Sequence, residues 1–208
     1  MSETKKSEGI GRLILVLGLI TFVCALLLGV VNQVTAPLIE QNEINTRNAA
    51  MEEIIPGAQF EDLGTVLSAE EVAAAGVTLP AGRTAAAISG VYQATVDGQD
   101  AGYCVQVNPK GFGGALTLIV GVGTDGNIAG IKVTGHAETP GLGAKAQTDS
   151  AWVAQYQGAA ADGQLMVTKD GGTINAITGA TITSRAVTDG VNTAAAYIAT
   201  LGEAGGRP

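Results

Sequence analysis

The sequence contains few of the residues that build metal centres, disulfides or aromatic cores. Its 208 residues include one histidine, two cysteines and only 4% aromatic residues. Cys24 lies inside a long apolar run and Cys104 in a later region of mixed polarity, so we expect no disulfide between them. A single histidine, His136, without a cysteine cluster argues against zinc or iron–sulfur ligation. We therefore expect no metal site and a core of aliphatic side chains.

An excess of basic residues is also missing. The formal net charge is −8 at pH 7, which argues against a nucleic acid as partner. The charges are unevenly spread, because the stretch from Leu13 to Val31 contains none. This run, LILVLGLITFVCALLLGVV, exceeds the roughly 18 apolar residues that mark a transmembrane helix. The sequence therefore predicts one membrane span near the N-terminus.

The main alternative to a span is a cleaved signal peptide. Its apolar region would be shorter, about 7–15 residues, and would end at a small-x-small cleavage site. Ala36 and the small residues near it leave this alternative open, whereas the length of the run favours an uncleaved span. Lys5, Lys6 and Arg12 precede the run. The positive-inside rule then predicts a cytoplasmic N-terminus and a large domain on the outer side of the membrane.

Turn residues and apolar spacing divide the chain further. The polar stretch after the span carries apolar residues at helical spacing and stops at Pro56-Gly57, which predicts a connecting helix. Residues 57–89 are rich in alanine and glycine, and there we expect loops around a short helix near 69–75. The expected segments are a cytoplasmic N-terminus at 1–12, a transmembrane helix at 13–31, a connecting helix at 32–56, a folded ligand-binding domain at 57–201 and a loose tail at 202–208.

From Gly90 onward, apolar and polar residues alternate in the manner of β-strands. Asp97-Gly98 and the later run Thr124-Asp125-Gly126-Asn127 are strong turn signals between these strands. From Ser184 the apolar spacing becomes that of an amphipathic helix, which we expect to pack against the sheet. The predicted fold class is therefore α+β, with an antiparallel sheet and packed helices after one transmembrane helix.

The segment Thr178–Ser184, TGATITS, joins the sheet region to this last helix. Gly179 and Ala180 have little side-chain bulk, so a ligand can approach the backbone. The first N–H groups of the following helix and its dipole favour an anion. The pattern indicates a phosphate-binding turn. The simpler interpretation is an ordinary helix N-cap at Thr183 or Ser184.

A second segment, HAETPGLG at residues 136–143, follows a predicted strand. Two glycines flank Leu142, which permits close contact with a flat ring, although alone the segment is a Pro-Gly turn. His136 is more typical of a polar residue at a strand end than of a proton donor. Trp152, a little later, is more typical of a core anchor than of a ring-stacking partner.

Taken together, these segments resemble a known family. The run GFGGALTLIVGVGTDGNIAGIKVTGHAETPGLG (111–143), then Trp152, then TGATITSRAV (178–187) is similar to the FMN-binding domain of the RnfG family. An N-terminal span before an outer domain fits the same family. The NqrC family of sodium-pumping NADH:quinone oxidoreductases is related but usually longer, which favours RnfG.

The resemblance implies a covalent cofactor. In this family a flavin transferase moves FMN from FAD to a threonine hydroxyl in an S/T-G-A-T motif, which makes a phosphoester. Carried over, the acceptor is Thr181, and Asn175 stands where the family often has aspartate. The other cofactor-binding residues implied are Thr178, Gly179, Ala180, Thr183, Glu138, Thr139, Pro140, Gly141, Leu142 and Gly143.

The resemblance also implies a function. The chain would be the electron-transfer subunit of a membrane-bound Rnf-type ion-translocating ferredoxin:NAD+ oxidoreductase, an electron carrier rather than an independent catalyst. Its partners would be the other membrane, flavin and iron–sulfur subunits, with a flavin transferase for maturation. Two alternatives stay open. One is a flavinylated subunit of another extracytosolic electron-transfer system, NqrC-like or stand-alone. The other is a membrane-anchored module that binds a phosphate-containing ligand non-covalently.

Overall fold

The computed structural model describes residues 3–203, with side chains described for residues 10–201. The chain divides into two compact units, Met1–Thr46 and Arg47–Pro208. The first two and the last five residues lie outside the described part of the chain. They include the start of the predicted cytoplasmic N-terminus and most of the predicted tail.

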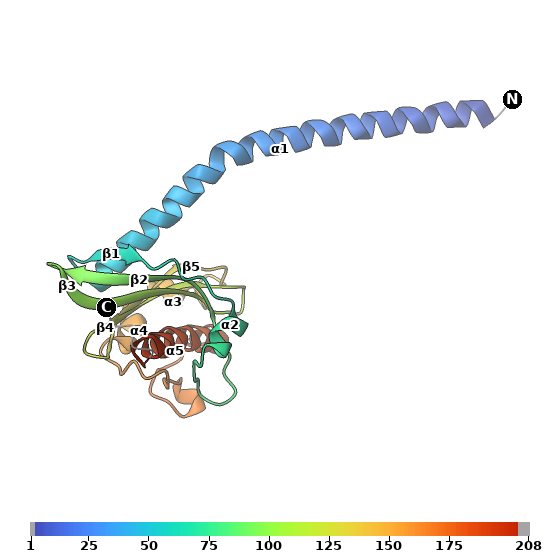
Figure 1. Ribbon diagram of the computed structural model, residues 1–208. Helices are drawn as coiled ribbons and strands as arrows, with labels where there is room; N and C mark the ends of the chain where they lie inside the picture. The colour runs from blue at the N-terminus through green and yellow to red at the C-terminus, as the bar shows by residue number, and fades with distance from the viewer. Residues whose placement is uncertain (1–2, 204–208) are drawn as a thin grey trace. The chain divides into compact units, whose positions relative to one another are not determined.

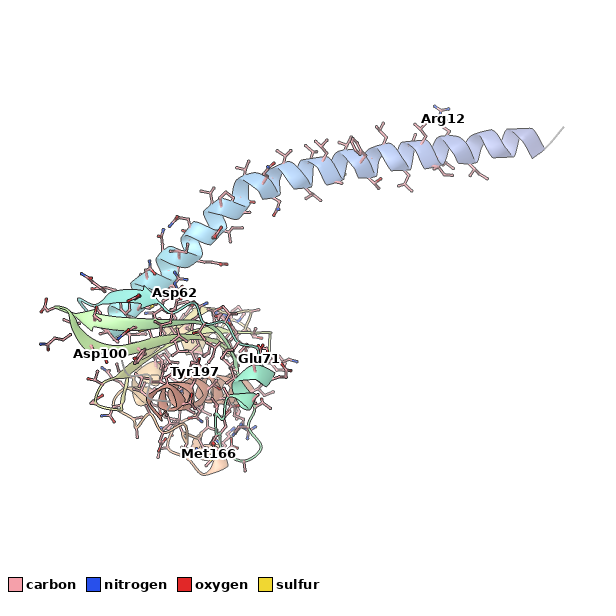
Figure 2. All side chains as sticks on the ribbon, viewed as in Figure 1. Arg12, Asp62, Glu71, Asp100, Met166 and Tyr197 are labelled. Carbon is pink, nitrogen blue, oxygen red and sulfur yellow. The ribbon has the colours of Figure 1, made fainter. Side chains whose placement is uncertain are left out.

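The first unit is built from one helix. Helix α1 runs from Glu3 to Ile54 and contains Pro37, which cannot donate a backbone hydrogen bond within the helix. Its part Ile10–Ile54 is the one helix among the described residues that is long and apolar enough to cross a membrane, and an 18-residue window in it has a mean hydropathy of 3.0. Apolar side chains stand out all around its first half (Figure 2). The predicted boundary between span and connecting helix falls inside this continuous helix, and the division itself stays a prediction.

The second unit contains a five-stranded antiparallel sheet in the order β1-β2-β3-β4-β5. Each strand pairs with the one before it in the chain (Figure 1). Asp97 and Gly98, between β2 and β3, have φ of 51° and 77°, the left-handed values that a tight hairpin turn requires. The predicted antiparallel α+β fold is confirmed. The strands are β1 (Gln59–Asp62), β2 (Ala87–Val96), β3 (Gln99–Asn108), β4 (Thr117–Gly123) and β5 (Ile128–Gly135).

Strand β1 lies in a region where we expected only loops and a short helix. It is a four-residue edge strand, QFED, in which only Phe60 is half-buried. Its pairing with β2 uses backbone groups, so its sequence carries no apolar alternation. The short helix is present as α2 (Ala69–Ala74), which begins with a capping box between Ser68 and Glu71.

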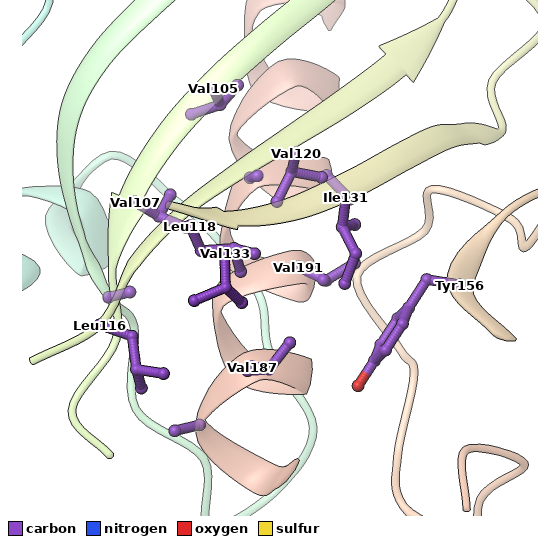
Figure 3. Packing of buried hydrophobic residues seen from close by; sticks show 14 of the residues in the cluster. Val105, Val107, Leu116, Leu118, Val120, Ile131, Val133, Tyr156, Val187 and Val191 are labelled. Atoms are coloured by element: carbon purple, nitrogen blue, oxygen red, sulfur yellow. The ribbon is translucent and has the colours of Figure 1, made fainter. Parts of the chain in front are cut away.

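The main core lies between one face of the sheet and helix α5 (Thr181–Glu203). Val187 and Val191 of α5 lie against the inward face of the strands (Figure 3). Along β4, Leu118 and Val120 belong to this core, whereas Ile119 faces the other side. Successive residues of β4 therefore face opposite sides of the sheet, as the alternation in the sequence predicted.

The opposite face of the sheet has a smaller core. The last turns of α1 supply Ala50 and Met51, which pack against Cys104 and Ile119. Burial raises the pKa of the Cys104 thiol to about 12, so it is a small apolar side chain rather than a thiolate. Both faces of the sheet are thus covered within this unit.

Short helices connect β5 to α5. They are α3 (Lys145–Thr148), α4 (Ser150–Val153) and the 3-10 turns η1 (Ala154–Tyr156) and η2 (Thr168–Asp170). In the stretch after α4, Val167 and Ile174 form an isolated bridge around the 3-10 turn η2. The chain from β5 to α5 is consequently held by side-chain contacts more than by a backbone ladder.

Candidate functional site

The TGATITS turn leads directly into helix α5. Gly179 adopts φ of +79°, which is unstrained only for glycine, and the Ala180 N–H donates to the Ile177 carbonyl at 3.0 Å. The Ser184 hydroxyl accepts from the Ile177 N–H at 2.9 Å and donates to the Ala180 carbonyl at 3.0 Å. The buried Ser184 side chain therefore holds the turn through two hydrogen bonds. Thr181 is half-buried and lies on the more exposed side of the turn.

The helix begins three residues earlier than the sequence suggested. We expected it from Ser184, with Thr183 or Ser184 as the simpler N-cap interpretation, but α5 starts at Thr181. Both predicted caps were wrong, since Thr183 and Ser184 already belong to the first turn of the helix and are buried. The Thr183 hydroxyl donates to Glu138, and the Ser184 hydroxyl bonds to the backbone of Ile177 and Ala180, contacts that an apolar-spacing argument does not detect.

The second predicted segment contacts the first through Glu138. This carboxylate is only 6% exposed. Its Oε2 accepts from the Thr183 hydroxyl at 2.7 Å, and its Oε1 accepts from the Gly113 N–H at 3.0 Å. A buried carboxylate with two donors is stabilised by charge-assisted bonds. Glu138 thus ties the 136–143 segment to both α5 and the glycine-rich loop after β3.

Glycines leave room for this carboxylate. A Cβ on Gly143 would meet Thr183 Oγ1 at 2.8 Å and also collide with a Glu138 oxygen. A Cβ on Gly111 would meet Leu116 Cδ1 at 2.7 Å and collide with the other Glu138 oxygen. A side chain at either glycine would therefore have to displace the Glu138 carboxylate from its present position.

These contacts surround a cavity of about 370 Å³. Eight of the eleven predicted cofactor residues line it, and Thr178, Pro140 and Gly141 lie beside it in the chain but not in its lining. Two segments more than 30 residues apart in sequence therefore meet at one cavity. The predicted lining residues are Glu138, Thr139, Leu142, Gly143, Gly179, Ala180, Thr181 and Thr183.

Three further residues line the cavity that sequence reasoning did not select: Phe112, Ile182 and Lys169. Phe112 is 70% exposed and Ile182 51% exposed, and Leu142 beside them is 44% exposed. Phe112 sits in the GFGG loop and Ile182 in the TGATITS turn, so both lay within segments already singled out. The apolar side chains of Phe112, Leu142 and Ile182 give the cavity a solvent-exposed apolar rim.

Lys169 contacts the predicted acceptor directly. Its Nζ donates to Thr181 Oγ1 at 3.0 Å. The next residue, Asp170, is bound by Arg83 and by Arg185, whose Nε lies 2.9 Å from Asp170 Oδ2. The hydrogen bonds from Arg185, together with those from Arg83, lower the pKa of Asp170 to about 2. No sequence pattern marks Lys169, because η2 and this ion-pair cluster place it.

Other singled-out residues have structural roles. Trp152 is buried, does not line the cavity, and donates from Nε1 to the Asn175 carbonyl at 2.6 Å. His136 accepts from the Glu138 N–H at 3.2 Å, next to the strand end. Asn175 is exposed at its side chain and is anchored by its backbone. Among the described residues, no group of three or more His, Cys, Asp or Glu side chains is placed to hold a metal ion.

The sequence matches two known families. Residues 111–196 match the FMN-binding domain, which covers every cavity-lining residue. Residues 10–54 match the RnfG N-terminal region, which corresponds to helix α1.

Curated relatives match nearly the whole chain. The G subunit of the Na(+)-translocating ferredoxin:NAD(+) oxidoreductase complex of Acetobacterium woodii is 37% identical, over 91% of this chain and 94% of its own. The G subunit of the ion-translocating oxidoreductase complex of Pseudomonas aeruginosa is 34% identical, over 88% and 86%. The G subunit of the proton-translocating ferredoxin:NAD(+) oxidoreductase complex of Clostridium ljungdahlii is 29% identical, over 97% and 98%.

Among solved structures, the C subunit of the Na(+)-translocating NADH-quinone reductase of Parabacteroides distasonis is similar. The match covers 55% of this chain and 63% of that one, with 28% identity and a TM-score of 0.46.

Proposed function

The chain belongs to the RnfG family of ion-translocating oxidoreductase subunits, and on that premise we propose that it carries FMN through a phosphoester to Thr181. As a member of this family with an FMN-binding domain, it is an FMN-binding subunit of an Rnf complex. With one helix among the described residues that is long and apolar enough to cross a membrane, and with relatives that are subunits of ion-translocating complexes, it is a single-pass membrane protein. The covalent linkage, its position and the orientation in the membrane are the proposed part.

The residues around the cavity fit FMN. A volume of about 370 Å³ lies within the range of sites for small ligands. The apolar rim of Phe112, Leu142 and Ile182 suits the faces of a flavin ring. The start of α5 suits a phosphate, because the N–H groups of its first turn have no partner within the helix. Apolar and anion-binding surfaces therefore lie side by side in one cavity.

The choice of Thr181 rests on how the neighbouring hydroxyls are used. Thr183 donates to Glu138, and Ser184 donates to the Ala180 carbonyl. Thr178 does not line the cavity. Thr181 is half-buried, lines the cavity and accepts from Lys169 there. This difference is the observation that carries the proposal, since it leaves Thr181 as the hydroxyl of the turn that is oriented for modification.

When bound, FMN supplies a centre that takes up and releases one or two electrons. The chain itself holds and orients the group: Thr181 would tether the phosphate, and the buried Glu138 fixes the two segments that form the cavity. A tether prevents loss of the cofactor on the outer side of the membrane, where free FMN is scarce. The chain is thus proposed as an electron carrier rather than an independent catalyst.

The proposed membrane orientation and the proposed partners follow from the family and from the distribution of charged residues. Lys5, Lys6 and Arg12 before the span favour a cytoplasmic N-terminus, with the FMN domain on the periplasmic or extracellular side. The proposed partners are the other Rnf subunits and a flavin transferase for maturation. Both Na(+) and protons appear in the names of relatives, so either ion is compatible with this family.

Denaturing gel electrophoresis with in-gel flavin fluorescence tests the linkage. The native chain and Thr181→Val are each expressed with a flavin transferase. We expect a fluorescent native band and a dark variant band. A dark native band, with the transferase active on a known substrate, would instead favour a non-covalent binding module.

Copurification in mild detergent tests the partners. We expect the chain to bring down other Rnf subunits. A chain that purifies alone from cells that contain the full complex would favour a stand-alone flavoprotein.

A further inference from the structure

Lys169 is the cation nearest to the proposed acceptor. Its Nζ lies 3.0 Å from Thr181 Oγ1, and both residues line the same cavity. The two residues are twelve positions apart and belong to different elements, η2 and α5. Their contact is therefore a product of the tertiary fold and not of neighbouring positions on one helix.

The turn that carries Lys169 is fixed on both sides. Before it, Val167 forms a bridge with Ile174, and the Thr168 N–H donates to the Ile174 carbonyl at 2.8 Å. After it, Asp170 is held by Arg83 and by Arg185 Nη2 at 2.5 Å. Because Arg185 lies one turn after Thr181 on α5, the same ion pairs that hold η2 also fix its distance from the acceptor.

The charge of Lys169 is uncompensated. Among the described residues, no carboxylate lies within ion-pair distance of its Nζ, although Asp170 is adjacent in sequence. Two guanidinium groups already neutralise Asp170. The Lys169 ammonium thus contacts the hydroxyl of the first residue of a 23-residue helix, at the end where the helix dipole also favours an anion.

We propose that Lys169 is the electrostatic partner of the Thr181 hydroxyl during flavin transfer and of the phosphodiester that results. This inference rests on the proposed function. In the step, Thr181 Oγ1 attacks the flavin-side phosphorus of FAD. A new P–O bond to Thr181 forms and the P–O bond to the adenylate breaks, so AMP leaves with the bonding electrons. The threonine proton passes to the transferase or to water, and no oxidation or reduction occurs.

The ammonium acts on the charge in this step. Negative charge on the transferring phosphoryl group grows next to Oγ1 in the transition state, where Lys169 already lies within hydrogen-bond distance. In the product, the same ammonium pairs with the phosphodiester oxygens. Arginine in its place keeps the charge, whereas methionine keeps only the length of the side chain.

The test measures transfer to the full chain in detergent. Unmodified chain, expressed without a transferase, is incubated with purified flavin transferase and FAD, and the initial rate of covalent fluorescence is recorded. Lys169→Met is expected to lower this rate about 10- to 100-fold. Lys169→Arg should recover most of the loss. The matched control is Lys145→Met, an exposed lysine outside the cavity lining, which should match the native rate.

Two readouts separate charge from structure. Emission of the buried Trp152 should be the same in all variants, because Lys169 itself is exposed. The ratio of native to Lys169→Met rates should shrink as ionic strength rises, since exposed charges are screened by salt.

The outcomes are distinct. If the native chain is modified and Lys169→Met is modified equally fast, the inference about Lys169 is wrong and the proposed function stands. Loss of modification in Lys169→Arg as well as Lys169→Met, independent of salt, would also overturn it, because shape and not charge would then be needed. If the native chain is never modified, the proposed function itself fails.

Discussion

Helix α5 has a cavity at each end, and the two cavities differ in the chemical groups that line them. The cavity at its N-terminus contains the Thr181 hydroxyl, the Lys169 ammonium and the buried Glu138. The cavity at its C-terminus, about 200 Å³, is lined mostly by glycine and aliphatic residues, with Asp100 among the few polar ones. The helix dipole favours anions at the first end and disfavours them at the second.

Volume and chemistry both distinguish these cavities, since the first holds about 370 Å³ and the second about 200 Å³. The first has the Lys169 ammonium bonded to the Thr181 hydroxyl at the start of α5, and its lining comes mostly from segments that the sequence singled out. The second has an acidic edge at the negative end of the helix, and its lining lies outside the TGATITS and HAETPGLG segments. The larger cavity is therefore also the one at which polar groups suited to a phosphate converge.

Removing the polar anchor of the first cavity should have the largest effect on stability. Glu138→Ala leaves the Gly113 N–H and the Thr183 hydroxyl without their acceptor, and bonds to charged groups contribute about 1.5–3 kcal/mol each. We expect the free energy of unfolding to fall by about 2–4 kcal/mol. Urea unfolding of the full chain in detergent, followed by Trp152 emission, measures it.

The matched variant at the second cavity is Asp100→Ala. Asp100 is exposed, and within the described part of the chain its carboxylate accepts from the Gly102 N–H alone, at 3.2 Å, so its loss should change stability by less than about 0.5 kcal/mol. If Glu138→Ala and Asp100→Ala lowered the free energy of unfolding equally, polar contacts would stabilise the two ends of α5 to the same degree.

Asp189, in the middle of α5, is expected to make the stability of the fold depend on pH. Burial raises the pKa of Asp189 to about 6 from an ordinary 3.8, despite the nearby Arg83. The folded state then binds more protons than the unfolded state between these values, so this group's contribution to stability is lost as pH rises from about 4 to 6.

Asp189→Asn should remove the loss of stability that the native chain shows as pH rises from about 4 to 6. A rise of about two pKa units corresponds to about 3 kcal/mol, and partial exposure of Asp189 to solvent reduces this, so from pH 4 to 7 the variant should gain on the order of 1–2 kcal/mol relative to the native chain. Asp170, whose pKa is lowered, should show the opposite trend, with its contribution lost only as pH falls below about 4 toward 2. A native curve that is flat between pH 4 and 6 would contradict the assignment to Asp189.

Filling the second cavity should have the smallest effect. Ala199 lines it from the solvent side of α5, and Ala199→Leu should change stability by no more than about 0.5 kcal/mol. Flavin incorporation, measured by in-gel fluorescence, should stay at the native level. A marked fall in incorporation would show that the cofactor site extends to this end of the helix.

The sequence predicted the fold where local rules decide the structure. Asp97-Gly98 fixed a hairpin because the left-handed φ values demand such residues, and Leu118 and Ile119 alternated because each strand has two faces. Strand β1 was missed because an edge strand pairs through its backbone. The start of α5 was placed late because Thr183 bonds to Glu138, 45 residues away.

As with the fold, only part of the candidate site could be predicted from the sequence. The two segments were recognisable from their residues, and the cavity brings eight of the chosen residues together. Lys169 was not recognisable, because its position depends on ion pairs between Arg83, Asp170 and Arg185 that no local pattern encodes. Residues supplied by tertiary ion pairs are those that sequence reasoning cannot find.

Peptide mass spectrometry tests the central claim most directly. Trypsin cleaves after Lys169 and Arg185, so one peptide, DGGTINAITGATITSR, contains all hydroxyls of the turn. For chain matured with a flavin transferase, we predict that this peptide gains the mass of FMN less one water, and that fragmentation places the group on Thr181. An unmodified peptide, or a flavin on Thr178, Thr183 or Ser184, would contradict the account.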